Sequence, residues 1–554
     1  MSVDCIVIGY NETPFDTYEG LLRTCGTQSE AYRDLRLSFV DVDGQPTPYI
    51  DLLNLVRSRV AAPGASVPPF HSGAIPNLAA AYLTNFLRQH GFTADYVNLF
   101  QREKSRLADL LAQQPRCVAI TTTFYVINLP VSEMVQFIRA CNSTVPIVVG
   151  GPLIANHARR FGAASVPSPG AAPQRIDAEL ETALADLDAD IYVIEGQGEL
   201  TLARVLDRLQ RGASPADVPN LVYREAGTGV YWRTRTEPEQ NDLDAARIDW
   251  RRLSTDPLGR TIQMRTARSC AFSCAFCNYP ERAGRLTLSH LDSVRAELDS
   301  IRERGGVMNV VFIDDTFNVP LARFKDLCRM MIAERYGFEW YSYFRCSNAD
   351  TEAFDLMAES QCKGVFLGIE SGSPTILKNM SKAATVEKYE EGIRQLKARG
   401  ILTFGSFILG FPGETDETVR ETRDFIVRTR PDFYRVQLWY CEAGTPIERQ
   451  RDKYRIVGDG FVWEHATMDS LTAMDRVEEI FLGVRESEWL PQWSFDFWII
   501  PYLRGEGLTR EGFTQFMRRA NRLLALQIAS VNPREREVLQ AQGFEELVQC
   551  SRQN

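Results

Sequence analysis

The segment Arg268-Ser-Cys270-Ala-Phe-Ser-Cys274-Ala-Phe-Cys277-Asn-Tyr-Pro280 decides how this sequence is interpreted. It follows the short apolar run Thr261–Arg265, which is typical of a buried strand, and it spaces three cysteines as C-x-x-x-C-x-x-C. Three thiolates are too few for a zinc site closed by four protein ligands. They suit a 4Fe–4S cube with one iron open to an exogenous ligand. The spacing therefore predicts an iron–sulfur cluster on Cys270, Cys274 and Cys277.

Two other readings of this loop stay open. The three cysteines could be unrelated buried thiols, or a distant side chain, such as one of the five histidines, could complete a zinc site. The other nine of the twelve cysteines are scattered singly among apolar neighbours. A secreted disulfide scaffold is small and dense in cysteine, so this chain of 554 residues is not of that class.

Short apolar runs alternate with helical patterns from about residue 261 to residue 447, which predicts a parallel α/β unit. Six βα units are too few for an eight-stranded barrel and favour a partial (β/α)6 barrel. The expected strands are Thr261–Arg265, Val310–Ile313, Glu339–Arg345, Gly364–Ile369, Thr403–Leu409 and Tyr434–Tyr440. Polar residues follow several of these strands at their carboxyl ends, which is where βα-barrel chemistry is built.

The cysteine loop resembles the signature of the radical S-adenosylmethionine (SAM) superfamily. The resemblance implies that SAM chelates the open iron and that reduction splits SAM to a 5′-deoxyadenosyl radical. It implies SAM contacts at Phe276, Asp314, Asp315, Arg345, Glu370, Ser371 and Ser406. A guanidinium fork matches a carboxylate, so Arg345 is the expected partner of the SAM carboxylate. The alternative for Asp314, Asp315 and Glu370 is that they cap helices.

Residues 1–240 also alternate strand and helix, and we expect a Rossmann-like α/β domain there. Its strand–glycine segments resemble the cobalamin-binding domain that precedes the core in one large radical SAM class. Glycine lets a flat corrin ring approach the backbone closely, and threonine hydroxyls suit its side-chain amides. The implied contacts lie at strand carboxyl ends: Thr121, Thr122, Thr123, Gly150, Gly151, Pro152, Glu195, Gly196 and Gly198. A scaffold without ligand is the alternative.

The Asp-x-His-x-x-Gly motif, whose histidine binds the lower face of cobalt in related domains, is absent from the sequence. We therefore expect cobalamin bound without a histidine ligand, with His71 and His157 as packing or surface residues. From residue 4 to about residue 450 the sequence resembles the group named after the P-methyltransferases of phosphinate antibiotics. That group is broad, so the resemblance does not identify the methyl acceptor.

Composition narrows the class of protein. The formal net charge is -10, which argues against binding nucleic acid, and hydrophobic residues make up 44%, as in globular proteins. No uncharged apolar run approaches the ~20 residues that cross a bilayer, and the N-terminus has no signal-peptide pattern. We expect a cytoplasmic protein with domains at 1–240 and 241–455, and a mostly helical region at 456–554 that shapes the substrate pocket.

The resemblance implies a methyltransferase that moves a methyl group from SAM, through methylcobalamin, to an unactivated carbon or a phosphinate phosphorus. Its substrate would be a small molecule, a peptide or a carrier-bound compound, and a flavodoxin or ferredoxin would supply electrons. One alternative is a cobalamin-binding radical SAM enzyme that rearranges or cyclises without methylating. An alternative of another class is a non-catalytic iron–sulfur or corrinoid carrier.

Overall fold

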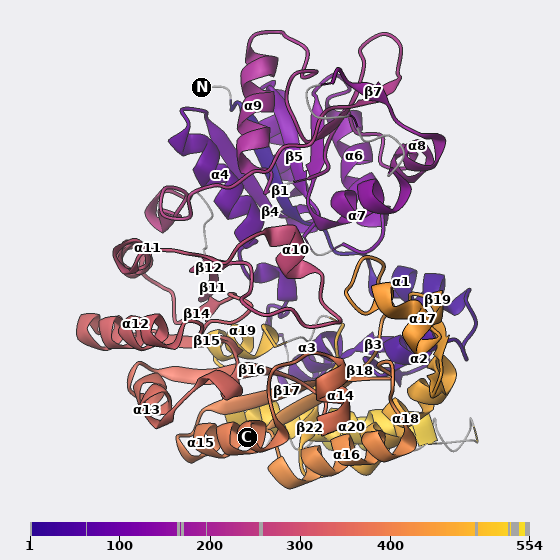
Figure 1. The fold of residues 1–554 in the computed structure, drawn as a ribbon. Helices are drawn as coiled ribbons and strands as arrows, with labels where there is room; N and C mark the ends of the chain where they lie inside the picture. Colours follow the sequence, from indigo (N-terminus) through magenta and orange to yellow (C-terminus); the bar gives the residue numbers. More distant parts are fainter. Residues whose placement is uncertain are drawn as a thin grey trace. The chain divides into compact units, whose positions relative to one another are not determined.

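The structure is a computed structural model that describes residues 3–62, 64–123, 125–162, 167, 171–195, 197–253, 259–493, 497–529, 532 and 542–548. The chain forms two compact units (Figure 1). Unit 1 comprises Met1–Thr13, Gly73–Gly259 and Leu288–Gly306, and unit 2 comprises Pro14–Ser72, Arg260–Thr287 and Val307–Asn554. Unit 1 has a mixed, mostly parallel sheet and unit 2 a parallel sheet, each with helices, which confirms the expected α/β class.

Unit 1 contains an eight-stranded sheet in the order β4-β1-β5-β6-β8-β9-β10-β7, and its first five strands are parallel. The strands are β1 (Cys5–Tyr10), β4 (Ala94–Leu99), β5 (Cys117–Thr121), β6 (Ile147–Gly150), β7 (Gln174–Arg175), β8 (Ile191–Val193), β9 (Leu221–Arg224) and β10 (Tyr231–Arg233). The helices are α4 (Leu78–Gln89), α5 (Phe100–Ala112), α6 (Leu129–Cys141), α7 (Pro152–Phe161), α8 (Ala178–Ala185), α9 (Glu199–Gln210) and α11 (Leu291–Arg304).

The core of unit 1 follows from the alternation of side chains along its strands. Ile6 and Ile8 of β1 point to one face, where they pack with Leu107 of α5 and Met134 of α6. Helices α4 and α9 lie together apart from α6, α7 and α8 (Figure 1). Because β4, β1, β5, β6 and β8 are parallel, their carboxyl ends meet at one edge of the sheet.

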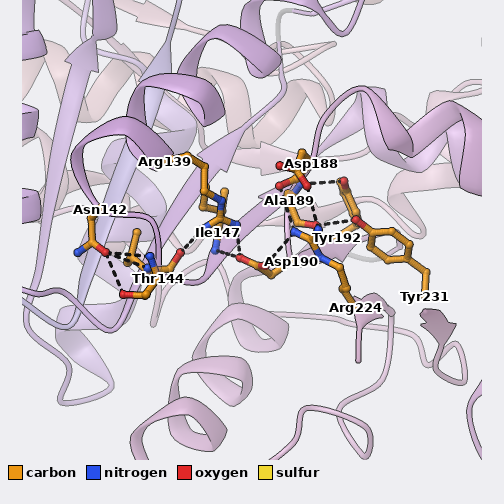
Figure 2. Close-up of polar contacts among 11 residues, drawn as sticks. Arg139, Asn142, Thr144, Ile147, Asp188, Ala189, Asp190, Tyr192, Arg224 and Tyr231 are labelled. Carbon is orange, nitrogen blue, oxygen red and sulfur yellow. Dashed lines mark hydrogen bonds and ion pairs between the residues drawn. The ribbon is translucent and has the colours of Figure 1, made fainter. Parts of the chain in front are cut away.

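The opposite edge of this sheet is held by a polar network around Asp190, which directly precedes β8 (Figure 2). Its carboxylate accepts hydrogen bonds from the guanidinium groups of Arg139, at 2.6 Å, and Arg224, at 3.0 Å. It also accepts the backbone N–H of Ile147 at 2.8 Å. Asp190 thereby joins α6, β6 and β9 at the start of the parallel strands.

Unit 2 contains a seven-stranded parallel sheet in the order β11-β14-β15-β16-β17-β18-β22. Its strands are β11 (Thr261–Met264), β14 (Asn309–Phe312), β15 (Glu339–Phe344), β16 (Cys362–Glu370), β17 (Leu402–Leu409), β18 (Phe433–Leu438) and β22 (Glu488–Trp489). The connecting helices are α12 (Leu321–Glu334), α13 (Thr351–Glu359), α14 (Pro374–Asn379), α15 (Val386–Ala398) and α16 (Asp416–Thr429). The first six strands are those predicted from the sequence, and β22 adds a short seventh strand.

Smaller elements complete unit 2. Near the cysteine loop they are β12 (Ala267–Arg268), α10 (Tyr279–Ala283) and β13 (Thr287–Leu288). Later elements are α17 (Arg451–Tyr454), β19 (Val457–Asp459), β20 (Val462–His465), β21 (Met468–Asp469), α18 (Ser470–Gly483), α19 (Ile499–Gly505) and α20 (Arg510–Ala529). No helix among the described residues is long and apolar enough to cross a membrane.

The compact units group the chain differently from the expected domains: Leu288–Gly306 lies in unit 1, and Pro14–Ser72 lies in unit 2. Residues 14–72 form α1 (Phe15–Arg23), α2 (Glu30–Arg36), β2 (Phe39–Val42), β3 (Gln45–Pro48) and α3 (Tyr49–Val60), and they belong to unit 2. Arg33 of α2 pairs with Glu478 of α18 at 2.9 Å, and the Tyr49 hydroxyl donates to Asn521 of α20 at 2.9 Å. These contacts join segments more than 440 residues apart in sequence, so local pattern carries no sign of them.

We expect Asp190→Asn to destabilise unit 1, because the substitution removes the shared negative charge that Arg139 and Arg224 bind. Charge-assisted hydrogen bonds contribute about 1.5–3 kcal/mol, so the loss should be in that range. Thermal unfolding of the full chain measures it. Asp217→Asn is the matched control, because Asp217 makes a similar pair with Arg208 but its side chain is 60% exposed. Equal melting temperatures for the two variants would contradict this role of Asp190.

Candidate functional site

The cysteine loop leaves β11 and runs through β12 to α10. Its backbone is fixed from two directions: the N–H of Ala275 donates to the Met380 carbonyl at 2.8 Å, and the N–H of Ile447 donates to the Ala275 carbonyl at 2.9 Å. Within the loop, the N–H of Cys277 donates to the Cys274 carbonyl at 3.1 Å. Segments after α14 and after β18 therefore hold the middle cysteine in place.

The three thiols of the loop are the ligand type that an iron–sulfur cluster needs. Among the described residues, no three His, Cys, Asp or Glu side chains are arranged to hold one metal ion. In an iron–sulfur cube each thiolate binds its own corner iron, so the ligands need not converge on one point. Burial, opposed by two nearby cations, raises the pKa of Cys274, and burial raises that of Cys277 to about 11. Metal binding would therefore release protons from these thiols.

Arg345 follows β15 and packs against the loop. Its guanidinium lies 3.7 Å from the centroid of the Phe272 ring, and it also donates to the Lys382 carbonyl and, at 3.1 Å, to the Ser347 hydroxyl. The Arg345 backbone N–H donates to the Asn318 side chain at 3.0 Å, which joins the ends of β14 and β15. The predicted SAM-carboxylate partner thus lies beside the cysteine loop, buried and with its orientation fixed.

Glu370 ends β16 in a left-handed conformation, with φ at 69°, next to an irregularity in the pairing with β17. Its carboxylate accepts the Lys382 ammonium at 2.7 Å, and both side chains are about nine-tenths buried. A Cβ at Gly368 would lie 2.7 Å from Glu370 Oε1, so a larger residue there would displace the Glu370 carboxylate. This pair is buried at the carboxyl end of the sheet.

Lys382 also reaches the cysteine loop. Its ammonium lies 5.4 Å from the centroid of the Phe276 ring, within the range of a cation–π contact. Its charge and that of Arg345 lower the pKa of Cys274 against the effect of burial. The loop's two phenylalanines, Phe272 and Phe276, are thus each paired with a buried cation, Arg345 after β15 and Lys382 between α14 and α15. Two positive charges beside thiolates offset part of the charge that a cluster would bring.

Two predicted SAM contacts have their polar groups occupied by the protein itself. Asp314 is buried and accepts the N–H groups of Thr266, at 2.7 Å, and Ala267, at 2.9 Å, so it fixes the turn from β11 into the loop. The Ser371 hydroxyl hydrogen-bonds to the Thr422 hydroxyl of α16 at 3.1 Å. Partial desolvation and the Asp314 carboxylate raise the pKa of Asp315 to about 6.

Ser406 lies on β17 in register with Gly368 of β16 and Arg435 of β18. It is buried in the middle of the sheet, one strand from Glu370. The structure therefore groups Cys274, Phe276, Arg345 and Glu370 around Lys382. Lys382 was missed by the sequence analysis because lysine is mostly exposed, and no local pattern marks one that is buried.

The predicted corrin contacts of unit 1 lie at one sheet edge, since Thr121 pairs with Gly150 and Gly150 with Val193. The Thr121 hydroxyl donates to the Gly9 carbonyl at 2.9 Å, and the Thr122 hydroxyl donates to the Gly150 carbonyl at 3.0 Å. Both hydroxyls thus bond to backbone carbonyls and stabilise this edge of the sheet.

The surface at that edge of the sheet carries few large side chains. Gly151 and Pro152 are exposed, and Gly151 has φ at 120°, where a Cβ would meet the Thr122 hydroxyl at 2.7 Å. Gly198 has φ at 89° and begins α9, while Glu195 pairs with Arg159 at 3.2 Å. Thr123 is exposed, and Gly196 lies outside the described residues. A flat ring fits an edge that carries glycine and proline in this way.

We expect Lys382→Met to destabilise unit 2, because it leaves the Glu370 carboxylate buried without its partner. Breaking a buried ion pair costs about 3–5 kcal/mol. Thermal unfolding and iron content after anaerobic reconstitution should both fall. The double variant Glu370→Gln/Lys382→Met should recover most of the stability, and Lys388→Met, at an exposed position, should behave as wild type. A single variant as stable as wild type would show that the pair is not buried in solution.

The buried carboxyl group of Glu414 should make the free energy of unfolding depend on pH. It is 1% exposed and accepts hydrogen bonds from the Gly410 N–H and the Thr418 hydroxyl, and burial raises its pKa from 4.5 to about 7. Between these values the folded chain binds a proton that the unfolded chain does not. The free energy of unfolding should therefore fall as the pH rises from 4.5 to 7, by at most about 3 kcal/mol.

Urea unfolding of wild type and Glu414→Gln at several pH values measures this effect. The Gln variant should lack the decline, whereas Glu417→Gln, whose side chain is 76% exposed, should retain it. Parallel curves for wild type and Glu414→Gln would contradict the assignment.

The part of the chain that contains the site is similar to known proteins. Residues 264–426 match the model of the radical SAM superfamily. An uncharacterized methyltransferase of Pyrococcus horikoshii is 29% identical over 267 residues, which are 46% of this chain and 56% of that protein. The anaerobic magnesium-protoporphyrin IX monomethyl ester cyclase of Rubrivivax gelatinosus is 24% identical over 443 residues, 74% of this chain and 75% of the cyclase. The chain thus spans about half the length of the first relative.

Two solved structures share the fold. The radical SAM methyltransferase TsrM of Kitasatospora setae, solved with cobalamin and a 4Fe–4S cluster, superposes with a TM-score of 0.54 at 22% identity, covering 69% of this chain and 73% of TsrM. OxsB, a cobalamin-dependent SAM radical enzyme solved with aqua-cobalamin and SAM, gives a TM-score of 0.52 at 16% identity, covering 87% of this chain and 69% of OxsB. Residues 264–426 therefore match the radical SAM superfamily, and the chain shares its fold with TsrM and OxsB.

Proposed function

We propose that this chain is a cobalamin-dependent radical SAM methyltransferase. The observation that carries the proposal is the arrangement around the cysteine loop, where the Cys274 thiol and the rings of Phe272 and Phe276 lie beside the buried cations Arg345 and Lys382. The fold shared with TsrM and OxsB, both solved with cobalamin bound, supports a cobalamin-binding role for unit 1. A cluster with SAM on its open iron supplies a 5′-deoxyadenosyl radical, and cobalamin carries a methyl group.

The chain's own residues have binding and positioning roles in this proposal. Cys270, Cys274 and Cys277 would hold the cluster, while Arg345 and Lys382 would orient the loop and face the carboxylate of SAM. Phe276 and Ser406 would line the SAM site, with Glu370, Ser371, Asp314 and Asp315 at the strand ends. The glycine-bearing edge of unit 1, at Gly150, Gly151, Pro152 and Gly198, would lie against the corrin ring. No side chain acts as an acid or base in this account.

For the methyl acceptor we propose only a chemical class. We propose an unactivated carbon or a phosphinate phosphorus on a small molecule, or on a peptide or carrier-bound compound, with a flavodoxin or ferredoxin as electron donor. The methyltransferase and cyclase relatives have different activities and are at most 29% identical, so the acceptor has to be identified by experiment.

A second candidate is a ring-forming or rearranging enzyme that does not transfer a methyl group. The observation that favours it is the cyclase of Rubrivivax gelatinosus, which matches three quarters of the chain. Product mass separates the two, because methylation adds one methylene unit and cyclisation adds none. SAM labelled in its methyl group would pass the label to the product only in the first case.

Anaerobic reconstitution followed by a SAM-cleavage assay tests the proposal. The wild-type chain should bind iron and convert SAM to 5′-deoxyadenosine or S-adenosylhomocysteine when a reductant is present. Cys274→Ala should lose the cluster's absorbance and all turnover, because a cluster with two thiolate ligands is not held. Cys25→Ala, which changes an exposed cysteine outside the site, should keep both. A wild-type chain that produces neither compound would overturn the proposal.

A further inference from the structure

A cavity of about 180 Å³ lies in unit 2 beside the short strand β22. This strand pairs with the first two residues of β18, Phe433 and Tyr434, whereas the predicted SAM contacts follow the last residues of β14, β15 and β16. In a parallel sheet these are opposite edges. The cavity is therefore separate from the site around the cysteine loop.

The rim of the cavity is positively charged. Arg485, Arg518 and Arg522 line it, against a single acidic residue, Glu488. Glu488 already accepts a hydrogen bond from Arg518 at 2.8 Å. In the described part of the chain, the guanidinium groups of Arg485 and Arg522 have no ion-pair partner. The lining residues carry three arginines and one glutamate, and the carboxylate of the adjacent Glu486 accepts the Arg485 backbone N–H at 3.0 Å. Together these groups leave an excess of one positive charge in a protein whose net charge is -10.

Ser487 supplies an independent sign of a ligand. This residue lines the same cavity and is 6% exposed, yet its hydroxyl has no hydrogen-bond partner among the described residues. Buried polar groups are nearly always paired, because an unpaired one costs about 1–3 kcal/mol. An acceptor bound in the cavity would satisfy this hydroxyl.

The floor of the cavity is apolar and aromatic. Tyr434, which is 1% exposed, and Trp489, which is 3% exposed, form it, and their rings meet edge to face with centroids 5.5 Å apart. The volume is below the ~300 Å³ at which pockets for drug-sized ligands begin. The site thus suits a small ligand that presents an anionic group to the rim.

We propose that this cavity binds a phosphoryl group, either as inorganic phosphate or as the phosphate monoester of a small molecule. Arginine forks match phosphate oxygens bidentately, and the excess positive charge of the rim favours an anion. The Ser487 hydroxyl donates to one phosphate oxygen, and the aromatic floor contacts the organic part of a monoester. This site is independent of the proposed methyltransferase activity.

Isothermal titration of the full reconstituted chain in chloride buffer tests the proposal, with inorganic phosphate and phenyl phosphate as separate probes. Wild type should bind at least one of them. Arg485→Gln and Arg522→Gln should each weaken binding by about tenfold or more, because each removes a charge-assisted hydrogen bond. Ser487→Ala should weaken it by about fivefold. Arg519→Gln, on the same helix as Arg522 but outside the cavity, should bind as wild type.

The two probes distinguish the sources of the phosphoryl group. Tighter binding of phenyl phosphate indicates a monoester that contacts Tyr434 and Trp489, and equal binding indicates free phosphate. Absence of binding heat for both probes at millimolar concentration would overturn the proposal, as would glutamine variants that bind like wild type. Neither outcome bears on SAM cleavage, since the cavity lies away from the cysteine loop.

Discussion

The ammonium of Lys382 is buried between the Glu370 carboxylate and the Phe276 ring, and the site depends on this arrangement. An isolated buried charge is very unfavourable, so the lysine and the glutamate have to be kept together. The Glu370 backbone is left-handed there, and its carboxylate lies where a Cβ at Gly368 would contact it. The pair links the end of β16 to the loop that carries the cysteines.

Arg345, which follows the neighbouring strand β15, makes a second cation–π contact with the cysteine loop. Its guanidinium stacks on Phe272 and bonds to the Lys382 carbonyl, so the two cations are connected through one backbone group. A short loop between a strand and a helix would otherwise have few fixed contacts of its own. Cation–π contacts at both phenylalanines hold it where the strand ends converge, and they place positive charge beside Cys274. The two cations thus support the loop and offset part of the negative charge of thiolates.

Much of this organisation could be predicted from the sequence. The apolar runs located the six strands β11 to β18, because strands buried on both faces are continuous stretches of β-branched and aromatic residues. The cysteine spacing located the loop, and the polar residues after β14, β15 and β16 lay at the expected edge. The assignment of residues 14–72 to unit 2 could not be predicted, since its contacts, such as Arg33 with Glu478, are remote in sequence.

Two features of the site were also beyond sequence reasoning. The burial of Lys382 results from a pairing across twelve residues that no periodicity reveals. The hydroxyls of Thr121, Thr122 and Ser371 bond to backbone or to α16, and local sequence does not tell a bracing hydroxyl from one that awaits a ligand. Only the packed structure separates these roles.

The central claim is that the three thiols hold a cluster whose open iron binds SAM. Electron paramagnetic resonance of the anaerobically reconstituted, reduced wild-type chain measures this directly, with and without SAM. The account predicts the signal of a reduced 4Fe–4S cluster that changes when SAM is added. A chain that takes up zinc in place of iron, or a cluster signal indifferent to SAM, would contradict it.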